Sequence, residues 1–180
     1  MNQFKLKEDG SLLTPEFIVS FPAVFEPSRI NGKFGCGLMF PKETTDMKIL
    51  EKAIETAAKE NWGTNMPKKL STPILDGDDS DREERAGMWY INAKGPNGGK
   101  FAPALIDRDK DDISDPEDFY PGCFARARIT LFAYTHKETG NKGVSVGVRS
   151  IQKLKDGEPL VSRVKAEDDF EDLPSVEDDL

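Results

Sequence analysis

The sequence predicts a mainly β protein: a small, closed or nearly closed antiparallel barrel of five to six strands with one helix. Apolar segments with a period of two recur along the chain, and only one segment has helical periodicity. Turns rich in Gly and Pro separate these segments. The chain has 180 residues, a length that suits one domain with extensions better than two domains.

The first strands are expected after a polar lead-in of residues 1–15. Residues 16–21 form a strand-like segment that stops at Pro22. After a loop, residues 33–40 alternate and end at Pro41. Their pattern places four apolar side chains on one face, those of Phe34, Cys36, Leu38 and Phe40.

One helix is expected over residues 45–61, as a lid over one end of the barrel. Its apolar side chains recur at three- and four-residue spacing, at Met47, Leu50, Ala53, Ile54, Ala57 and Ala58. Thr44 or Thr45 can cap the start of this helix, and Gly63 can end it.

The second half of the chain begins with a long polar loop over residues 63–87. Strands are expected over residues 88–94 and 100–106. Two longer strands, over residues 122–134 and 143–155, form a hairpin with a turn at residues 139–142. The acidic composition after residue 165 predicts a folded domain of residues 1–165 and a disordered tail of residues 166–180.

Charge is distributed unevenly along the chain. The net charge is −8, but the tail alone holds eight acids and no base. Two loop segments, residues 76–84 and 107–118, hold thirteen more acids and three bases. The rest of the chain then has 22 basic and 12 acidic residues. A basic framework inside an acidic protein points towards nucleic acid.

Several classes of protein are excluded. No apolar run is long enough for a transmembrane helix, and the N-terminal residues lack the apolar region of a secretory signal. Two cysteines and one histidine cannot form a four-ligand zinc site. A disulfide framework is not expected either, so we place the protein in a reducing cytoplasm, with no membrane partner.

The most informative segment for function is the strand over residues 122–134. One of its faces is apolar, and mostly small. The other alternates rings with positive charge: Phe124, Arg126, Arg128, Phe132 and Tyr134. Rings can stack on bases while arginines neutralise phosphates, so this face predicts a nucleic-acid-binding site. Other candidates on neighbouring strands are Arg149 and Lys153, expected to share a face, and Tyr90 and Lys94.

Two alternatives stay open at this point. The rings could pack under a loop while the arginines pair with the acidic loops. The chain could also be a metal-dependent nuclease that uses Asp76, Asp78, Asp107 and Asp109. These aspartates lie in Gly-, Ser- and Pro-containing loops, which favours a solvated-loop interpretation. No phosphate loop, nucleophile elbow or Cys–His signature is present, so neither catalysis nor a cofactor is expected.

The tail has sparse apolar residues among its acids, which is typical of an interaction segment. Residues expected to contact a partner are Phe170, Asp178, Asp179 and Leu180. The tail could also fold back on a basic groove as a polyanion.

Residues 119–134, with 140–148 and 152–159, resemble single-stranded DNA-binding proteins of tailed bacteriophages. The Pro41-Lys42 entry to the helix and the acidic terminal tail are similar to that group as well. The resemblance implies an OB-type barrel, binding of single-stranded DNA without sequence specificity, and a tail that contacts replication proteins such as a polymerase, helicase or primase. It also implies a place in phage replication or recombination, in the cytoplasm of the infected bacterium. The chain ends in Leu180, where no aromatic residue stands.

Overall fold

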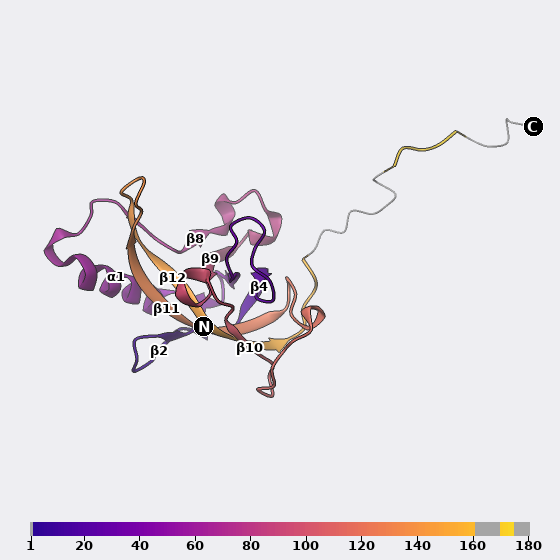
Figure 1. Ribbon diagram of the computed structural model, residues 1–180, viewed down its shortest axis with the longest axis horizontal. Coiled ribbons are helices and arrows are strands. Elements are labelled where there is room, and N and C mark those ends of the chain that lie inside the picture. The colour runs from indigo at the N-terminus through magenta and orange to yellow at the C-terminus, as the bar shows by residue number, and fades with distance from the viewer. Residues whose placement is uncertain (1, 161–169, 175–180) are drawn as a thin grey trace, which may run out of the picture.

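The computed structural model describes residues 2–160 and 170–174, and Figure 1 shows its arrangement. It confirms a mainly β, OB-like fold. Five strands close a ring in the order β12–β9–β5–β4–β11 and back to β12. They are β4 (Phe17–Ala23), β5 (Gly35–Pro41), β9 (Met88–Lys94), β11 (Phe124–Thr135) and β12 (Lys142–Lys155).

Four of the five pairings in the ring are antiparallel, as predicted. The fifth, between β9 and β12, is parallel, with Ala93 opposite Val146 and Lys94 opposite Gly147. The prediction of a wholly antiparallel barrel is therefore wrong at this pairing. Parallel neighbours need a long crossover, and here the crossover includes β10 and β11.

The hydrophobic core combines small side chains with large ones such as Phe17, Leu38 and Phe40. On the inner face of β11, Ala125, Ala127 and Ile129 are almost fully buried. Cys36 and Cys123 are also buried and do not form a disulfide. Removal from water raises the pKa of both thiols, because it disfavours the charged thiolate.

The helix α1 (Lys48–Trp62) begins three residues later than predicted. Thr45 and Asp46 form the short strand β6 instead and pair with β1 (Asn2–Gln3). Neither threonine caps the helix; the Asp46 carboxylate accepts a hydrogen bond from the Lys48 N–H. Gly63 ends the helix as predicted, with a φ of 55°. Helix α1 packs its apolar stripe on β11 and β12, beside the ring (Figure 1).

The interpretation of residues 1–15 as a polar lead-in is wrong. Phe4 and Leu12 are fully buried, and the Phe4 ring lies 5.2 Å from the ring of Phe40. Strands β2 (Lys5–Leu6) and β3 (Leu12–Leu13) form a small hairpin that pairs with β11. Two-residue strands are too short to show a period of two, so the sequence carried no pattern for them.

The remaining elements are short. They are the strands β7 (Leu70–Ser71), β8 (Leu75–Asp76) and β10 (Ala104–Ile106), the turn α2 (Pro96–Gly99), and the 3-10 helices η1 (Gly63–Asn65), η2 (Gly77–Asp79), η3 (Glu83–Arg85) and η4 (Pro116–Asp118). The strand predicted over residues 100–106 is thus reduced to three residues, and the long polar loop contains two strands. No helix within the described ranges has the length and apolar character that crossing a membrane requires.

The burial of the N-terminal segment leads to a test of stability. We expect Phe4→Ala to lower the free energy of unfolding by about 3–5 kcal/mol, because it leaves a cavity beside Phe40. Leu6→Ala is the matched control: Leu6 is 63% exposed, so its loss should change stability by less than about 0.5 kcal/mol. Urea unfolding followed by circular dichroism measures both. Equal effects of the two changes would contradict a core role for Phe4.

Candidate nucleic-acid interface

The two faces of β11 have the characters that the sequence predicts. Its inner face is buried, and its outer face carries the ring and arginine side chains. Phe132 is 38% exposed, and Arg126 is also exposed. Phe124, Arg128 and Tyr134 are partly exposed. The face runs along the ribbon formed by β11 and β12, which rises beyond the barrel in Figure 1.

The β11–β12 pairing has one bulge at Arg149 and a second at Leu154, beyond Lys153. Arg128 pairs with Ser150 and Ile129 with Val148, so Arg149 is an extra residue in a bulge. Lys153 pairs with Ala125, a residue of the inner face. The prediction that Arg149 and Lys153 share a face is therefore wrong, because the bulge at Arg149 shifts the alternation by one residue.

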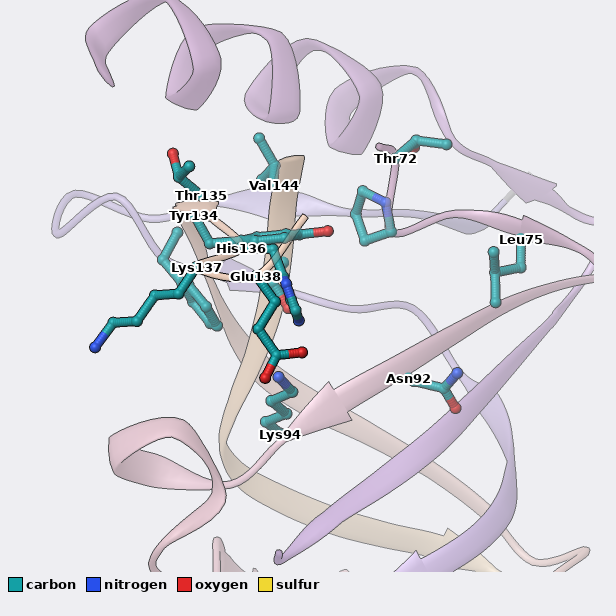
Figure 2. Close-up of a pocket in the computed structure, with 13 residues that line it drawn as sticks. Thr72, Leu75, Asn92, Lys94, Tyr134, Thr135, His136, Lys137, Glu138 and Val144 are labelled. Carbon is teal, nitrogen blue, oxygen red and sulfur yellow. The ribbon is translucent and has the colours of Figure 1, made fainter. Parts of the chain in front are cut away.

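A first cavity of about 680 Å³ lies between β9 and the far end of the β11–β12 ribbon. Figure 2 shows Asn92 and Lys94 of β9 on one side of it and Tyr134 with the following turn on another. Phe132 also lines this cavity. The turn contributes ionisable groups of both signs, on His136, Lys137 and Glu138. Two predicted rings and one predicted lysine thus meet at one site.

A second cavity, of about 440 Å³, adjoins the first. It shares Asn92 and Lys94 with the first cavity and continues from them to Phe21 and Arg85. We call the two cavities together the groove. It crosses the outer face of β9, so a chain of linked groups can follow it from the β11–β12 turn to the β4–β5 loop.

Lys94 stands where the two cavities meet. Burial lowers its pKa, and the nearby ammonium group of Lys33, which lines the second cavity, lowers it further. Neither lysine forms an ion pair with another residue in the described part of the chain. Two like charges in a partly desolvated place are unfavourable alone, and an anion bound there would relieve the repulsion.

The arginines of the outer face lie further along β11 and are held by neutral or single acidic partners. Arg126 donates to the Gln152 side chain at 2.8 Å, and Arg128 donates to the Ser11 hydroxyl at 2.6 Å. Asp9 lies 3.3 Å from Arg149 and 3.9 Å from Arg128. Hydrogen bonds from Ser11 and the Arg149 charge hold the pKa of Asp9 far below its usual range. These arginines do not pair with the acidic loops.

Phe124 and Lys153 lie at the start of the ribbon, with partners of their own. Lys155 Nζ is 4.7 Å from the centre of the Phe124 ring. Lys153 forms an ion pair of 2.7 Å with Asp156 and lies 5.4 Å from the centre of the Tyr120 ring. The groove does not include them.

Tyr90 is not placed as a freely accessible ring. Its side chain points away from the barrel interior, but it is only 1% exposed. The Arg85 guanidinium carbon lies 3.7 Å from the centre of the Tyr90 ring. The cover comes from the loop between β8 and β9, which strand alternation does not describe.

The acidic loops do not build a metal site. Lys42 forms ion pairs with Asp76 and Asp78 at 2.5 and 2.7 Å, and the hydrogen bonds that it donates lower the pKa of both carboxyl groups. In the other loop, Asp107 accepts backbone hydrogen bonds from Asp109 and Asp111. No group of three or more His, Cys, Asp or Glu gathers as metal ligands anywhere in residues 2–160 or 170–174. The nuclease alternative is not supported.

The sequence analysis missed Phe21, Lys33, Arg82 and Arg85, all of which line the second cavity. Arg82 lies inside the loop segment whose acids dominated the charge count, and Arg85 follows it directly. Phe21 is the residue before a proline, where a strand was expected to stop. A basic pair inside an acidic loop was the available signal.

An OB-like ring, with a groove of rings and of lysines that pair with no described acid, is the arrangement of a single-stranded nucleic-acid-binding protein. Residues 11–180 match the family described as Enterobacter phage Enc34, ssDNA-binding protein, and the chain belongs to that family. It has no match among the curated proteins.

Solved structures of the Enc34 single-stranded DNA-binding protein are 25% identical to this chain, with a TM-score of 0.74. For one, 95% of this chain and 96% of that chain are covered. Another is a complex with single-stranded DNA, with 89% and 95% covered. The fold also matches a single-stranded DNA-binding protein encoded by bacteriophage T7, at a TM-score of 0.67, 12% identity, and coverage of 92% and 97%.

The hydrogen bonds that the loop aspartates already accept lead to a test of the nuclease alternative. Asp76 and Asp78 are held by one lysine and Asp107 by backbone N–H groups, so we expect Mg²⁺ to find no preformed site with two metals about 4 Å apart. A labelled single-stranded oligonucleotide incubated with the protein and Mg²⁺ should shift in mobility and stay uncut. Cleavage that is lost with EDTA and in Asp76→Asn would contradict this expectation.

Proposed function

We propose that this chain binds single-stranded DNA in the groove without sequence specificity, and coats exposed strands during phage DNA replication or recombination. The observation that carries the proposal is the meeting of two cavities at Lys94. Rings line the far end of one cavity, Lys94 stands at the junction with Lys33 of the second cavity near it, and no described acid pairs with either lysine. The related Enc34 protein solved with single-stranded DNA supports the same ligand.

The chemistry of the groove favours single strands over a particular sequence. Phe132 and Tyr134 offer ring faces on which any base can stack, because every base has a π-face. Lys33 and Lys94 can neutralise phosphates, which every nucleotide carries. Stacking of this kind needs unpaired bases, so a duplex would lose most of the available contacts.

The other predicted side chains extend this interface in the proposal. The ribbon that carries Phe132 also carries Arg126, Arg128 and Arg149. Arg126 precedes Phe132 by six residues, which is about 20 Å along an extended strand. These arginines would attract the phosphates of a DNA strand that leaves the groove, once the ion pairs of Asp9 with Arg128 and Arg149 break. Phe124 and Lys153 stand at the end of this path. Tyr90 would take part only through Arg85, which covers it.

The groove proposal is tested by removing one ring. Phe132→Ala should weaken binding of single-stranded DNA by about 1–3 kcal/mol, the range for losing one stacked base. Phe101→Ala is the matched control, because Phe101 is 55% exposed and lines neither cavity.

In the same assay, Arg126→Ala or Arg128→Ala should lower the slope of log affinity against log salt by about 0.7 each. Fluorescence anisotropy over a salt series measures both quantities. Unchanged affinity in Phe132→Ala would place the DNA elsewhere.

The acidic tail has a separate role in the proposal. A folded domain of residues 1–165 would hold the DNA, and residues 166–180 would contact replication proteins in the cytoplasm of the infected bacterium. Phe170 and Leu173 are exposed, as a partner contact requires. Asp178, Asp179 and Leu180 lie outside the described residues. The eight carboxylates of the tail give it the charge of a short polyanion.

Deletion of residues 166–180 tests the charge competition. We expect the truncated chain to bind single-stranded DNA more tightly, because the tail no longer competes for the basic groups. The gain should be largest at low salt and should fade towards 0.15 M, where the Debye length is about 8 Å. Replacing the eight acids by Asn and Gln at unchanged length is the control for chain length. Equal affinities of full-length and truncated protein across the salt series would leave the tail as a solubilising segment.

A further inference from the structure

The wall of the second cavity carries an alternating stack of guanidinium groups and rings. The Arg85 guanidinium carbon lies 3.7 Å from the centre of the Tyr90 ring and 5.9 Å from that of Phe21. The Arg82 guanidinium carbon lies 4.3 Å from the centre of the Phe21 ring. These four side chains come from β4, β9 and the loop between β8 and β9. We call them the arginine–ring stack.

The loop that supplies the arginines is fastened at both ends. Lys42 holds Asp76 and Asp78, and the Asp78 carboxylate accepts a hydrogen bond from the Gly87 N–H at 2.7 Å. At Gly77 there is no room for a side chain, because a Cβ would clash with the Arg85 carbonyl oxygen. The carboxylates of Asp76 and Asp78 are directed towards Lys42 and the backbone, and Arg85 forms no ion pair within the described residues.

Arg85 is positioned by ring contact more than by hydrogen bonds. Its Nε is buried and donates to no described acceptor. Its one side-chain hydrogen bond, to the Ser80 hydroxyl, is long at 3.5 Å. Arg82 has a distant ion pair with Glu84, at 3.8 Å. Guanidinium groups with few in-plane partners retain donors and a flat face for a ligand.

Phe21 is held in a backbone conformation that its side chain disfavours. Its φ is 42°, in the left-handed region, and its ring is 50% exposed. The pairing of β4 with β5 is interrupted between Ser20 and Ala23. A bulky residue at positive φ costs free energy of the order of 1 kcal/mol or more, and such strain tends to persist at ligand sites. A strained, half-exposed ring at the mouth of a cavity points to a ligand that contacts the ring.

We propose that the arginine–ring stack is a nucleobase-binding site, with Phe21 as the stacking face and Arg82 and Arg85 beside it. A base would enter the second cavity and lie on the Phe21 ring. The guanidinium groups would stack against it or donate to its carbonyl oxygens. Tyr90 supports Arg85 from behind and does not touch the base. This site rests on the proposed function, and it adds a base contact at the end of the groove opposite to Phe132.

The test compares a thymidine oligonucleotide with an abasic oligonucleotide of the same length, which keeps the phosphates and lacks the bases. Phe21→Ala in the full chain should weaken binding of the thymidine oligonucleotide about 5- to 150-fold and leave abasic binding unchanged. Arg85→Lys keeps the charge and loses the planar group. It should weaken thymidine binding about 2- to 30-fold, with an unchanged salt slope. Phe101→Ala and Arg108→Lys are the matched controls outside the groove.

The variant Phe21→Gly distinguishes a role of Phe21 in DNA binding from a role in stability. Glycine removes the ring and the strain together, so the melting temperature should stay or rise while thymidine binding falls. Phe21→Tyr should restore binding. If the wild-type chain binds DNA but Phe21→Ala loses affinity equally for both oligonucleotides, or loses none, the nucleobase site alone is overturned. A wild-type chain that binds neither oligonucleotide would overturn the proposed function with it.

Discussion

The parallel pairing of β9 with β12 closes the five-stranded ring, and this closure determines where the groove lies. This pairing sets Lys94 opposite Gly147, and it brings the outer face of β9 beside the far end of the β11–β12 ribbon. Gly147 has no side chain, and a Cβ there would lie 2.9 Å from Thr130 Oγ1 and 3.7 Å from the Phe132 ring. The missing side chain leaves room for Thr130 and Phe132 of β11 beside this pairing. The two cavities adjoin because Asn92 and Lys94 of β9 line both of them.

The sequence predicted what depends on local periodicity. The strand over residues 88–94, the apolar stripe of the helix and the two faces of β11 are all visible as repeats. Arg149 and Lys153 could not be placed from parity, because the bulge at Arg149 has no local signature in the sequence. Tyr90 was predicted as a DNA-binding ring, but Arg85 of the loop directly before β9 covers it. Phe4 and Leu12 lie in segments too short for any repeat, and their burial depends on the completed barrel.

Charge in this protein is organised by local pairing rather than by the balance along the chain. Lys42 takes up two carboxylates of the β8–β9 loop, and Asp9 takes up two arginines of the ribbon. Lys33 and Lys94 remain in the groove with each other as neighbours. A protein with a net charge of −8 can therefore present a positive surface at one place. The net charge alone would have suggested a positively charged partner instead of DNA.

The buried cysteines make the chain suited to site-directed labelling. Cys36 and Cys123 lie in the interior, and burial keeps both as thiols, which react slowly because the thiolate is the nucleophile. A cysteine introduced at an exposed position of the ribbon would then take up a maleimide dye while the native pair stays unmodified. Fluorescent reporters can thus be attached one at a time without first replacing native residues in the core.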